Sequence, residues 1–115
     1  MVGRRARLSR DRALGRGGAV KLGIVLATGD FSRAAAIALA ARRADHEVAL
    51  FAMDIGCQAL ADAPALVAAL LDADCELTAC SNSAVGVALP DGVVRGSQDD
   101  HAAVVVTSDR VVALT

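Results

Sequence analysis

Short apolar runs alternate with helix-like stretches from Val20 to the end of the chain. The first of these runs, Leu22–Ala27, is continuously apolar, which is the pattern of a strand buried on both faces. Five strands are expected in all, over residues 22–27, 48–53, 75–80, 93–95 and 110–114. Strands that are separated by helices pair in parallel and carry those helices on both faces of their sheet. The alternation therefore predicts an α/β fold of three layers, α/β/α, around a five-stranded and mostly parallel sheet.

The stretches between these runs predict four helices, over residues 32–44, 64–71, 81–90 and 98–107. The first is rich in Ala and ends in Arg42 and Arg43, whose charges favour the C-terminus of a helix. Pro64 suits the first turn of the second helix, which follows an expected loop at 54–58. The last helix has Ser97 as its cap and an acidic first turn.

The first 19 residues differ in composition from the rest of the chain. They hold six Arg and one Asp, a balance of +5, whereas residues 20–115 hold six basic and twelve acidic residues, a balance of −6. The apolar side chains in this stretch are too few to offset the entropy of ordering it. We therefore expect a disordered basic tail at 1–19 and one domain at 20–115. Both an arm for nucleic acid or an acidic partner and a dispensable leader fit this tail, and the leader is the interpretation we prefer.

Composition also bears on location and partners. The sequence has neither the apolar core of a secretory signal nor a run of about 18 apolar residues, so we expect a cytoplasmic protein without a membrane partner. Its three Cys are then expected to be reduced thiols. Phe31 and Phe51 are the aromatic residues, and this scarcity argues against binding of single-stranded nucleic acid, which uses aromatic stacking. We expect no nucleic-acid partner. A core of Ala, Val and Leu buries little area per residue, which favours an oligomer.

Reactive side chains fall at the carboxyl ends of the expected strands, where ligands gather in parallel sheets. Cys80 ends the third strand, Cys57 follows the second and His101 follows the fourth. Cys80 is also expected to open a helix, whose free N–H groups and dipole favour the thiolate over the thiol. Cys75 and His46 fall at the opposite edge, and we assign them to structure. Cys80 is therefore the candidate reactive residue.

Other uses of these residues stay open. Cys57 is a candidate resolving thiol and His101 a candidate proton-transfer group, although a purely structural role is the commoner one for both residue types. A metal site made of Cys57, Cys80 and His101 has no compact ligand motif behind it, and we expect neither a metal nor a cofactor. A phosphate site at residues 27–30 is disfavoured because Asp30 stands where the phosphate would sit.

A strand followed by Cys-x-x-Ser-Ala, at residues 76–84, is the most specific motif of the chain. With it, the stretch from Leu22 to Leu114 resembles the DsrE/DsrF-like (DsrEFH) family of small sulfur-relay proteins, to which TusD-like sulfurtransferases belong. Less specific matching pieces lie at residues 33–40, 46–51, 54–56 and 109–112. In that family the Cys at this position carries a persulfide. The resemblance therefore implies that Cys80 accepts a persulfide sulfur and passes it on.

The same resemblance implies an assembly of like or related subunits, with persulfide-donor and acceptor proteins as partners. The chain departs from some relatives in the short segment between the second strand and its helix, where they have a covering loop. Some members lack the cysteine and serve as structural subunits. A non-catalytic structural or binding subunit is therefore the alternative function.

Overall fold

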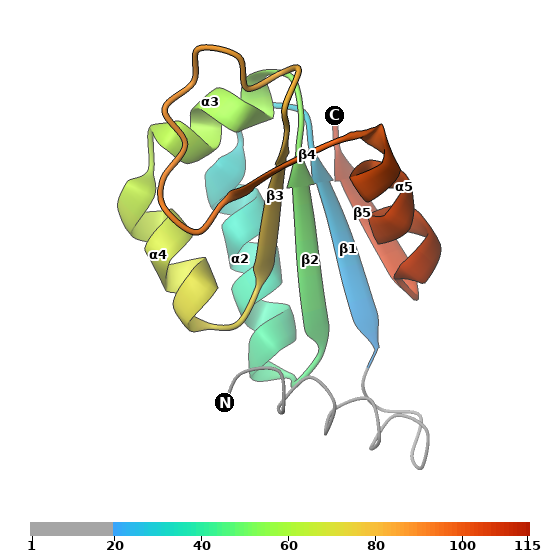
Figure 1. Cartoon of the computed structure of the whole chain (residues 1–115). Coiled ribbons are helices and arrows are strands. Elements are labelled where there is room, and N and C mark those ends of the chain that lie inside the picture. The colour runs from blue at the N-terminus through green and yellow to red at the C-terminus, as the bar shows by residue number, and fades with distance from the viewer. Residues whose placement is uncertain (1–19) are drawn as a thin grey trace.

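Five strands and four helices make up residues 20–115, the part of the chain that the computed structural model describes (Figure 1). The strands are β1 (Lys21–Leu26), β2 (Glu47–Ala52), β3 (Glu76–Cys80), β4 (Val94–Gly96) and β5 (Arg110–Leu114). The helices are α2 (Phe31–Arg43), α3 (Ile55–Ala61), α4 (Pro64–Asp72) and α5 (Gln98–Thr107). The tail expected at 1–19 lies outside the described residues.

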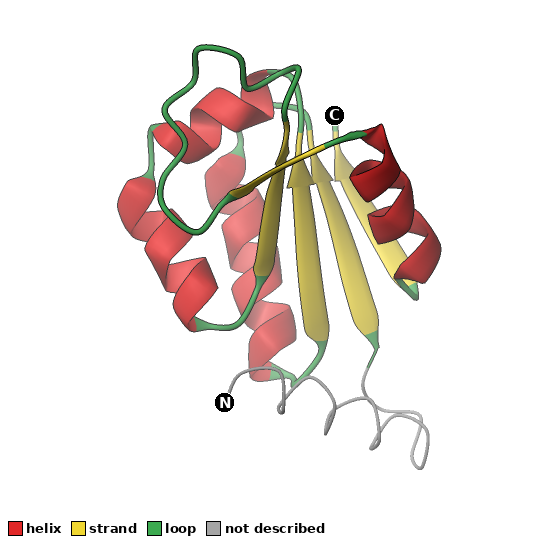
Figure 2. Ribbon diagram, in the orientation of Figure 1, coloured by secondary structure: helices red, strands yellow, loops and turns green. Residues whose placement is uncertain are grey.

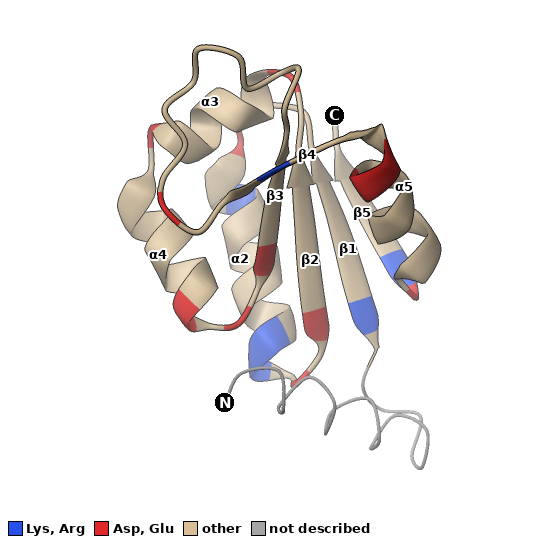
Figure 3. Ribbon diagram, viewed as in Figure 1, with Lys and Arg blue, Asp and Glu red and all other residues tan. Residues whose placement is uncertain are grey.

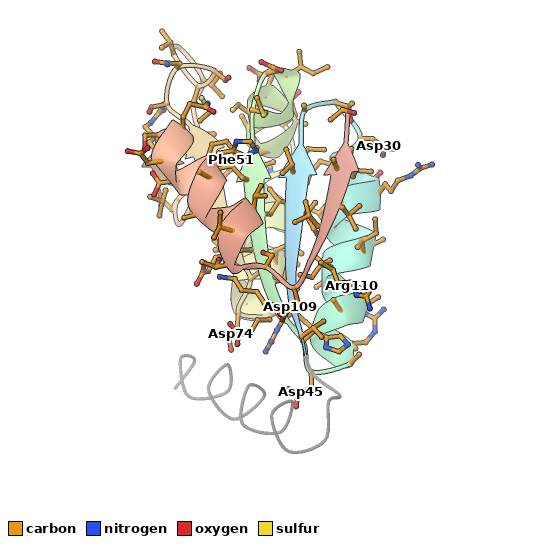
Figure 4. All side chains as sticks on the ribbon, turned by 90° about the vertical axis from the view of Figure 1, so that its right-hand side faces the viewer. Asp30, Asp45, Phe51, Asp74, Asp109 and Arg110 are labelled. Atoms are coloured by element: carbon orange, nitrogen blue, oxygen red, sulfur yellow. The ribbon has the colours of Figure 1, made fainter. Side chains whose placement is uncertain are left out.

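The strands form one sheet in the order β4-β3-β2-β1-β5, and all four neighbouring pairs are parallel. From β1 to β3 the chain steps in one direction, and α2, α3 and α4 cover one face of the sheet (Figure 1). The chain then returns from β4 to β5 at the far edge, and right-handed crossovers place the connecting helix on the opposite face. Figure 4 shows α5 and α2 on opposite sides of β1 and β5. The predicted three-layer α/β/α fold is confirmed.

The main core lies between the sheet and the three helices α2, α3 and α4. Ile24, Leu26 and Leu50 fill it from the sheet and are at most 1 % exposed. The helix α2 meets them through Ala residues, which let its backbone come close to the sheet. On the other face Phe51 is fully buried, and the centroids of its ring and of the His101 ring on α5 lie 5.1 Å apart. Burial on both faces explains the continuous apolar runs of these strands.

Charged residues mark the amino ends of the strands. Four of the five strands begin with one, namely Lys21, Glu47, Glu76 and Arg110, and Figure 3 shows acidic and basic positions side by side along this edge. The β1 start is tied to β5 because the Lys21 N–H donates to the Asp109 carboxylate over 2.7 Å. Charged side chains thus line the amino edge of the sheet, whereas Cys80 ends β3 at the carboxyl edge.

The helix α3 occupies residues that were expected to form a loop. Its Gly56 packs against the end of β1, where a Cβ atom at this position would collide with the Leu26 carbonyl oxygen. The helix thus depends on a close approach between distant segments, which the local pattern at 54–58 does not reveal.

No single helix within residues 20–115 is long and apolar enough to cross a membrane. The helices α3 and α4, which meet at 87°, reach the necessary length and hydropathy only when they are taken together as a bent pair.

The helix expected over 81–90 does not form. Residues 81–86 make hydrogen-bonded turns, and an irregular segment continues to β4 (Figure 2). One helical turn begins, since the Cys80 carbonyl accepts the Ala84 N–H over 2.9 Å, but Gly86 has a φ of +76°. A glycine in this left-handed conformation ends a helix. The other boundaries agree to within one residue, and β3 starts at Glu76 rather than Cys75.

Candidate functional site

Cys80 is the last residue of β3 and lies at the carboxyl edge of the sheet. It pairs with Gly96 of β4, and a Cβ atom at Gly96 would face Asp100 of α5, so the Cys80 side chain is on the α5 side. Gln98, the first residue of α5, donates its side-chain N–H to the Cys80 sulfur over 3.7 Å. The residue as a whole exposes 4 % of its surface. The Cys80 side chain is therefore largely buried at the carboxyl edge of the sheet, between β4 and the start of α5.

The segment Ser81–Val87, here named the Cys80 turn, gives the sulfur its main hydrogen-bond donors. The pKa of the Cys80 thiol is lowered first by the backbone N–H of Ser83 and then by the Ser83 hydroxyl. The Asn82 N–H and the Gln98 side chain lower it further, while burial opposes them. Successive N–H groups in a turn make a concave anion site, and they replace the helix N-terminus that we expected here. The result is a thiol biased toward its reactive thiolate form.

The Cys80 turn is anchored to β4. The backbone N–H and the hydroxyl of Ser81 both donate to the Gly96 carbonyl, over 2.8 and 2.7 Å. Further along the turn, the Arg95 guanidinium donates to the carbonyls of Ala84 and Val87 over 3.1 and 2.8 Å. The short edge strand β4 therefore supports the turn at both of its ends.

Cys57 lies near this site but belongs to the main core. It sits in α3 rather than in a loop, is fully buried, and directs its S–H toward the carbonyl oxygens of Ala52 and Cys80, at 3.5 and 3.9 Å. Burial is the largest cause that raises the pKa of the Cys57 thiol, followed by the nearby Cys80 charge. A buried thiol that favours its protonated form is a poor nucleophile. Its surroundings are those of a structural cysteine.

The remaining candidates lie further from the sulfur. The His101 ring packs on Phe51 and takes no part in the hydrogen bonds that act on Cys80. At the other end of β3, burial raises the pKa of Cys75 to about 11. His46 accepts the Val20 N–H through Nδ1 over 2.9 Å and so holds the start of β1. These contacts fit the structural assignment of Cys75 and His46.

No group of three or more His, Cys, Asp or Glu side chains within residues 20–115 is arranged to hold a metal ion. Cys57, Cys80 and His101 are therefore not brought together as a set of ligands.

Sequence reasoning missed the donors around Cys80. Ser83 is the Ser of the Cys-x-x-Ser-Ala motif, so the motif itself carried a signal for it. Gln98 was expected only as a helix start, and Arg95 only as a strand residue. Gln98 donates to Cys80 across 18 residues of chain, and Arg95 donates to Ala84 across 11. Both contacts depend on the pairing of β4 with β3 and on the position of α5. That pairing appears in no local pattern.

Comparisons of the chain with models of protein families, with curated proteins and with solved structures find no match. The chemistry of the site is the basis for the function proposed below.

Proposed function

We propose that this protein is a small sulfur carrier that accepts a persulfide sulfur on Cys80 and passes it to an acceptor thiol. The observation that carries the proposal is the set of donors around the sulfur: the N–H groups of Asn82 and Ser83, the Ser83 hydroxyl and the Gln98 side chain, which together lower the pKa of Cys80. A thiolate at the rim of a parallel sheet is placed for attack on a sulfur atom brought by a partner.

Sulfur transfer needs two balanced exchange steps. The Cys80 thiolate attacks the outer sulfur of a donor persulfide, R–S–SH, so that a new S–S bond forms on Cys80 and the donor leaves as the thiolate R–S⁻. The outer sulfur keeps its proton, and Cys80 becomes a persulfide. In the second step an acceptor thiolate attacks that outer sulfur, and Cys80 leaves as its thiolate. No external oxidant or reductant is consumed.

The donors suit both steps because Cys80 bears negative charge at the start of the first and at the end of the second. Fixed N–H groups stabilise such an anion without having to reorganise. A stabilised thiolate is also a better leaving group in the second step. A carrier needs both properties, since it must take the sulfur and then release it. The donor and acceptor are expected to be persulfide-bearing proteins and thiols of the same reducing compartment, which fits a cytoplasmic location.

The test is the intact mass of the protein after incubation with a low-molecular-weight persulfide. The wild type should gain about 32 Da, the mass of one sulfur atom added by this exchange. Cys80→Ser should gain nothing, whereas Cys57→Ser and Cys75→Ser serve as matched controls and should gain the same mass as the wild type. If Cys80→Ser still gains the mass and Cys57→Ser does not, Cys57 is the carrier residue and the proposal is wrong.

A second candidate function is a non-catalytic structural or binding subunit of an assembly. The 4 % exposure of Cys80 favours it, because a thiol that reagents do not reach transfers no sulfur. The two functions differ in one simple property. A carrier thiol reacts with iodoacetamide at neutral pH faster than free cysteine thiols of ordinary pKa, while a structural thiol in the folded protein is protected.

A further inference from the structure

Arg95 makes an unusual connection for a residue of an edge strand. It is the middle residue of β4, and its pairing with Ala79 puts its side chain on the face opposite to Cys80 and Gly96. From there the guanidinium donates through Nη1 to the Ala84 carbonyl, at 3.1 Å, and through Nη2 to the Val87 carbonyl, at 2.8 Å. One side chain thus spans two carbonyls of the Cys80 turn.

These two carbonyls belong to the part of the turn that aims the donors. Ala84 directly follows Ser83, and its N–H already donates to the Cys80 carbonyl over 2.9 Å. Its carbonyl accepts both the Val87 N–H, at 2.9 Å, and Arg95. The peptide groups on either side of Ala84 are therefore held, one by Cys80 and the other by Arg95 and Val87. Ser83 is attached to the first of them.

The Cys80 turn gains little support from regular secondary structure. The segment between β3 and β4 contains neither a helix nor a strand, and β4 itself is three residues long. A hydrogen-bond donor stabilises an anion only while it stays aimed at it. A guanidinium with five N–H groups in a rigid fork can bind two carbonyls at once, which an ammonium group cannot reproduce with fixed geometry.

We propose that Arg95 is a positioning residue, whose guanidinium fork holds the Cys80 turn in the conformation that directs the Ser83 and Asn82 donors at the Cys80 sulfur. The inference rests on the proposed function in one respect, that Cys80 is the reactive thiol. It concerns the state of that thiol before any sulfur arrives.

Charged groups from every neighbouring element have to be considered as well. Cys57 and Asp54 lie on the α3 side, where the Asp54 charge raises the pKa of Cys57. At the start of α5, the Asp100 carboxylate is bound to the Ser97 N–H over 2.7 Å, Asp99 is exposed, and His101 packs on Phe51. Arg95 itself carries a charge that acts through space, so the test has to separate this charge from the fork.

The experiment measures the rate of Cys80 alkylation by iodoacetamide as a function of pH, with the modified residue located by peptide fragmentation. Arg95→Met removes charge and fork, whereas Arg95→Lys keeps the charge and loses the fork. Ser83→Ala removes one donor directly and sets the scale. Arg33→Met is the matched control, because Arg33 is an exposed arginine on α2 that pairs with Asp30 at 3.4 Å. Circular dichroism melts show which variants are folded.

Arg95→Met should alkylate about tenfold more slowly than the wild type at neutral pH, which corresponds to a rise of about one unit in the pKa of Cys80. Arg95→Lys should show a rise as well, and Arg33→Met none. A pKa unchanged in Arg95→Met overturns the inference, and so does a shift in Arg95→Met that Arg95→Lys fully restores, since charge alone would then explain it. If Arg95→Met fails to fold, Arg95→Lys decides alone, and an unchanged pKa of Cys80 in that variant overturns the inference.

The wild-type profile keeps the two proposals distinguishable. An ordinary thiol pKa for Cys80 in the wild type contradicts the proposed function itself. If the wild-type pKa is lowered and every Arg95 variant retains that lowered value, the proposed function stands, but Arg95 does not position the donors around Cys80.

Discussion

Cys75 and Cys80 bracket the same strand and are equally buried, each with 4 % of its surface exposed, yet their thiols are shifted in opposite directions. Burial dominates at Cys75 and raises its pKa to about 11. At Cys80 the hydrogen bonds from Ser83, Asn82 and Gln98 outweigh burial and lower the pKa. The two shifts therefore have different causes: loss of water around the sulfur decides at Cys75, and hydrogen-bond donors around the sulfur decide at Cys80.

The raised pKa of Cys75 predicts a loss of stability at high pH. Above the ordinary thiol pKa of 9.0 the unfolded chain releases this proton, while the folded protein keeps it until about pH 11. Folding then binds a proton, so the free energy of unfolding falls as pH rises from 9 to 11, by about 2 to 3 kcal/mol.

Cys75→Ala should remove this contribution. Urea unfolding at pH 8 and at pH 10.5 measures it, and the variant should lose less stability between the two than the wild type does. An equal loss in both proteins would assign the alkaline instability to other groups. Cys80→Ala is the contrasting control: a thiol whose pKa is lowered gains stability as pH rises toward 9.0, so this variant should not lose less stability than the wild type.

At the scale of the elements, local sequence patterns predicted the helices and strands whose formation depends on neighbouring residues. The helix α2 has the basic last turn, and α5 the Ser97 cap and acidic first turn, that the sequence indicated. The structure adds an N-cap at Asp30 of α2 and completes a capping box on α5 with Asp100. The strands were found from apolar runs, and their parallel pairing from the helices between them. Patterns failed where a distant contact decides, as for Gly56 of α3 against β1.

The candidate site divides in the same way. The sequence placed Cys80 at the end of a strand, and it also led us to expect a thiol that favours its thiolate form. The cause differed, since turn donors and Gln98 act in place of a helix dipole. A single left-handed residue, Gly86, ends the helical turn that the composition of 81–90 favoured.

Gly56→Ala tests the contact that places α3. In an isolated helix this change is stabilising by up to about 1 kcal/mol, because Ala is the better helix former. Here the added Cβ meets the Leu26 carbonyl oxygen, a backbone atom that cannot rotate away. We expect the clash to dominate and to lower the free energy of unfolding by about 1 to 3 kcal/mol.

Urea unfolding measures this effect. The control is Gly29→Ala, where nothing lies within 4 Å of the added Cβ atom, and it should be neutral or slightly stabilising. Equal effects of the two substitutions would show that α3 does not depend on the close approach at Gly56.

At the scale of the whole molecule, the two faces of the sheet are covered unequally. Three helices cover one face, and α5 alone lies on the other with none of its residues buried (Figure 1). Val105, Val106 and Val111, on α5 and the adjacent edge strand β5, expose 41, 80 and 42 % of their surfaces. Apolar surface of this kind, next to the open edge of a sheet, is typical of sites at which proteins associate.

We therefore predict that the protein self-associates through α5 and β5. Closed symmetric assembly is the commonest way in which a soluble chain covers such a surface. Light scattering at micromolar concentration should give a mass above that of the monomer, 11.6 kDa. Val106→Lys should lower the mass toward the monomer, because a charge buried in an apolar interface is costly. Val85→Lys is the matched control, since Val85 is equally exposed, at 79 %, but lies in the Cys80 turn, and it should keep the wild-type mass. A monomeric wild type, or an equal effect of the two substitutions, would contradict an interface on α5.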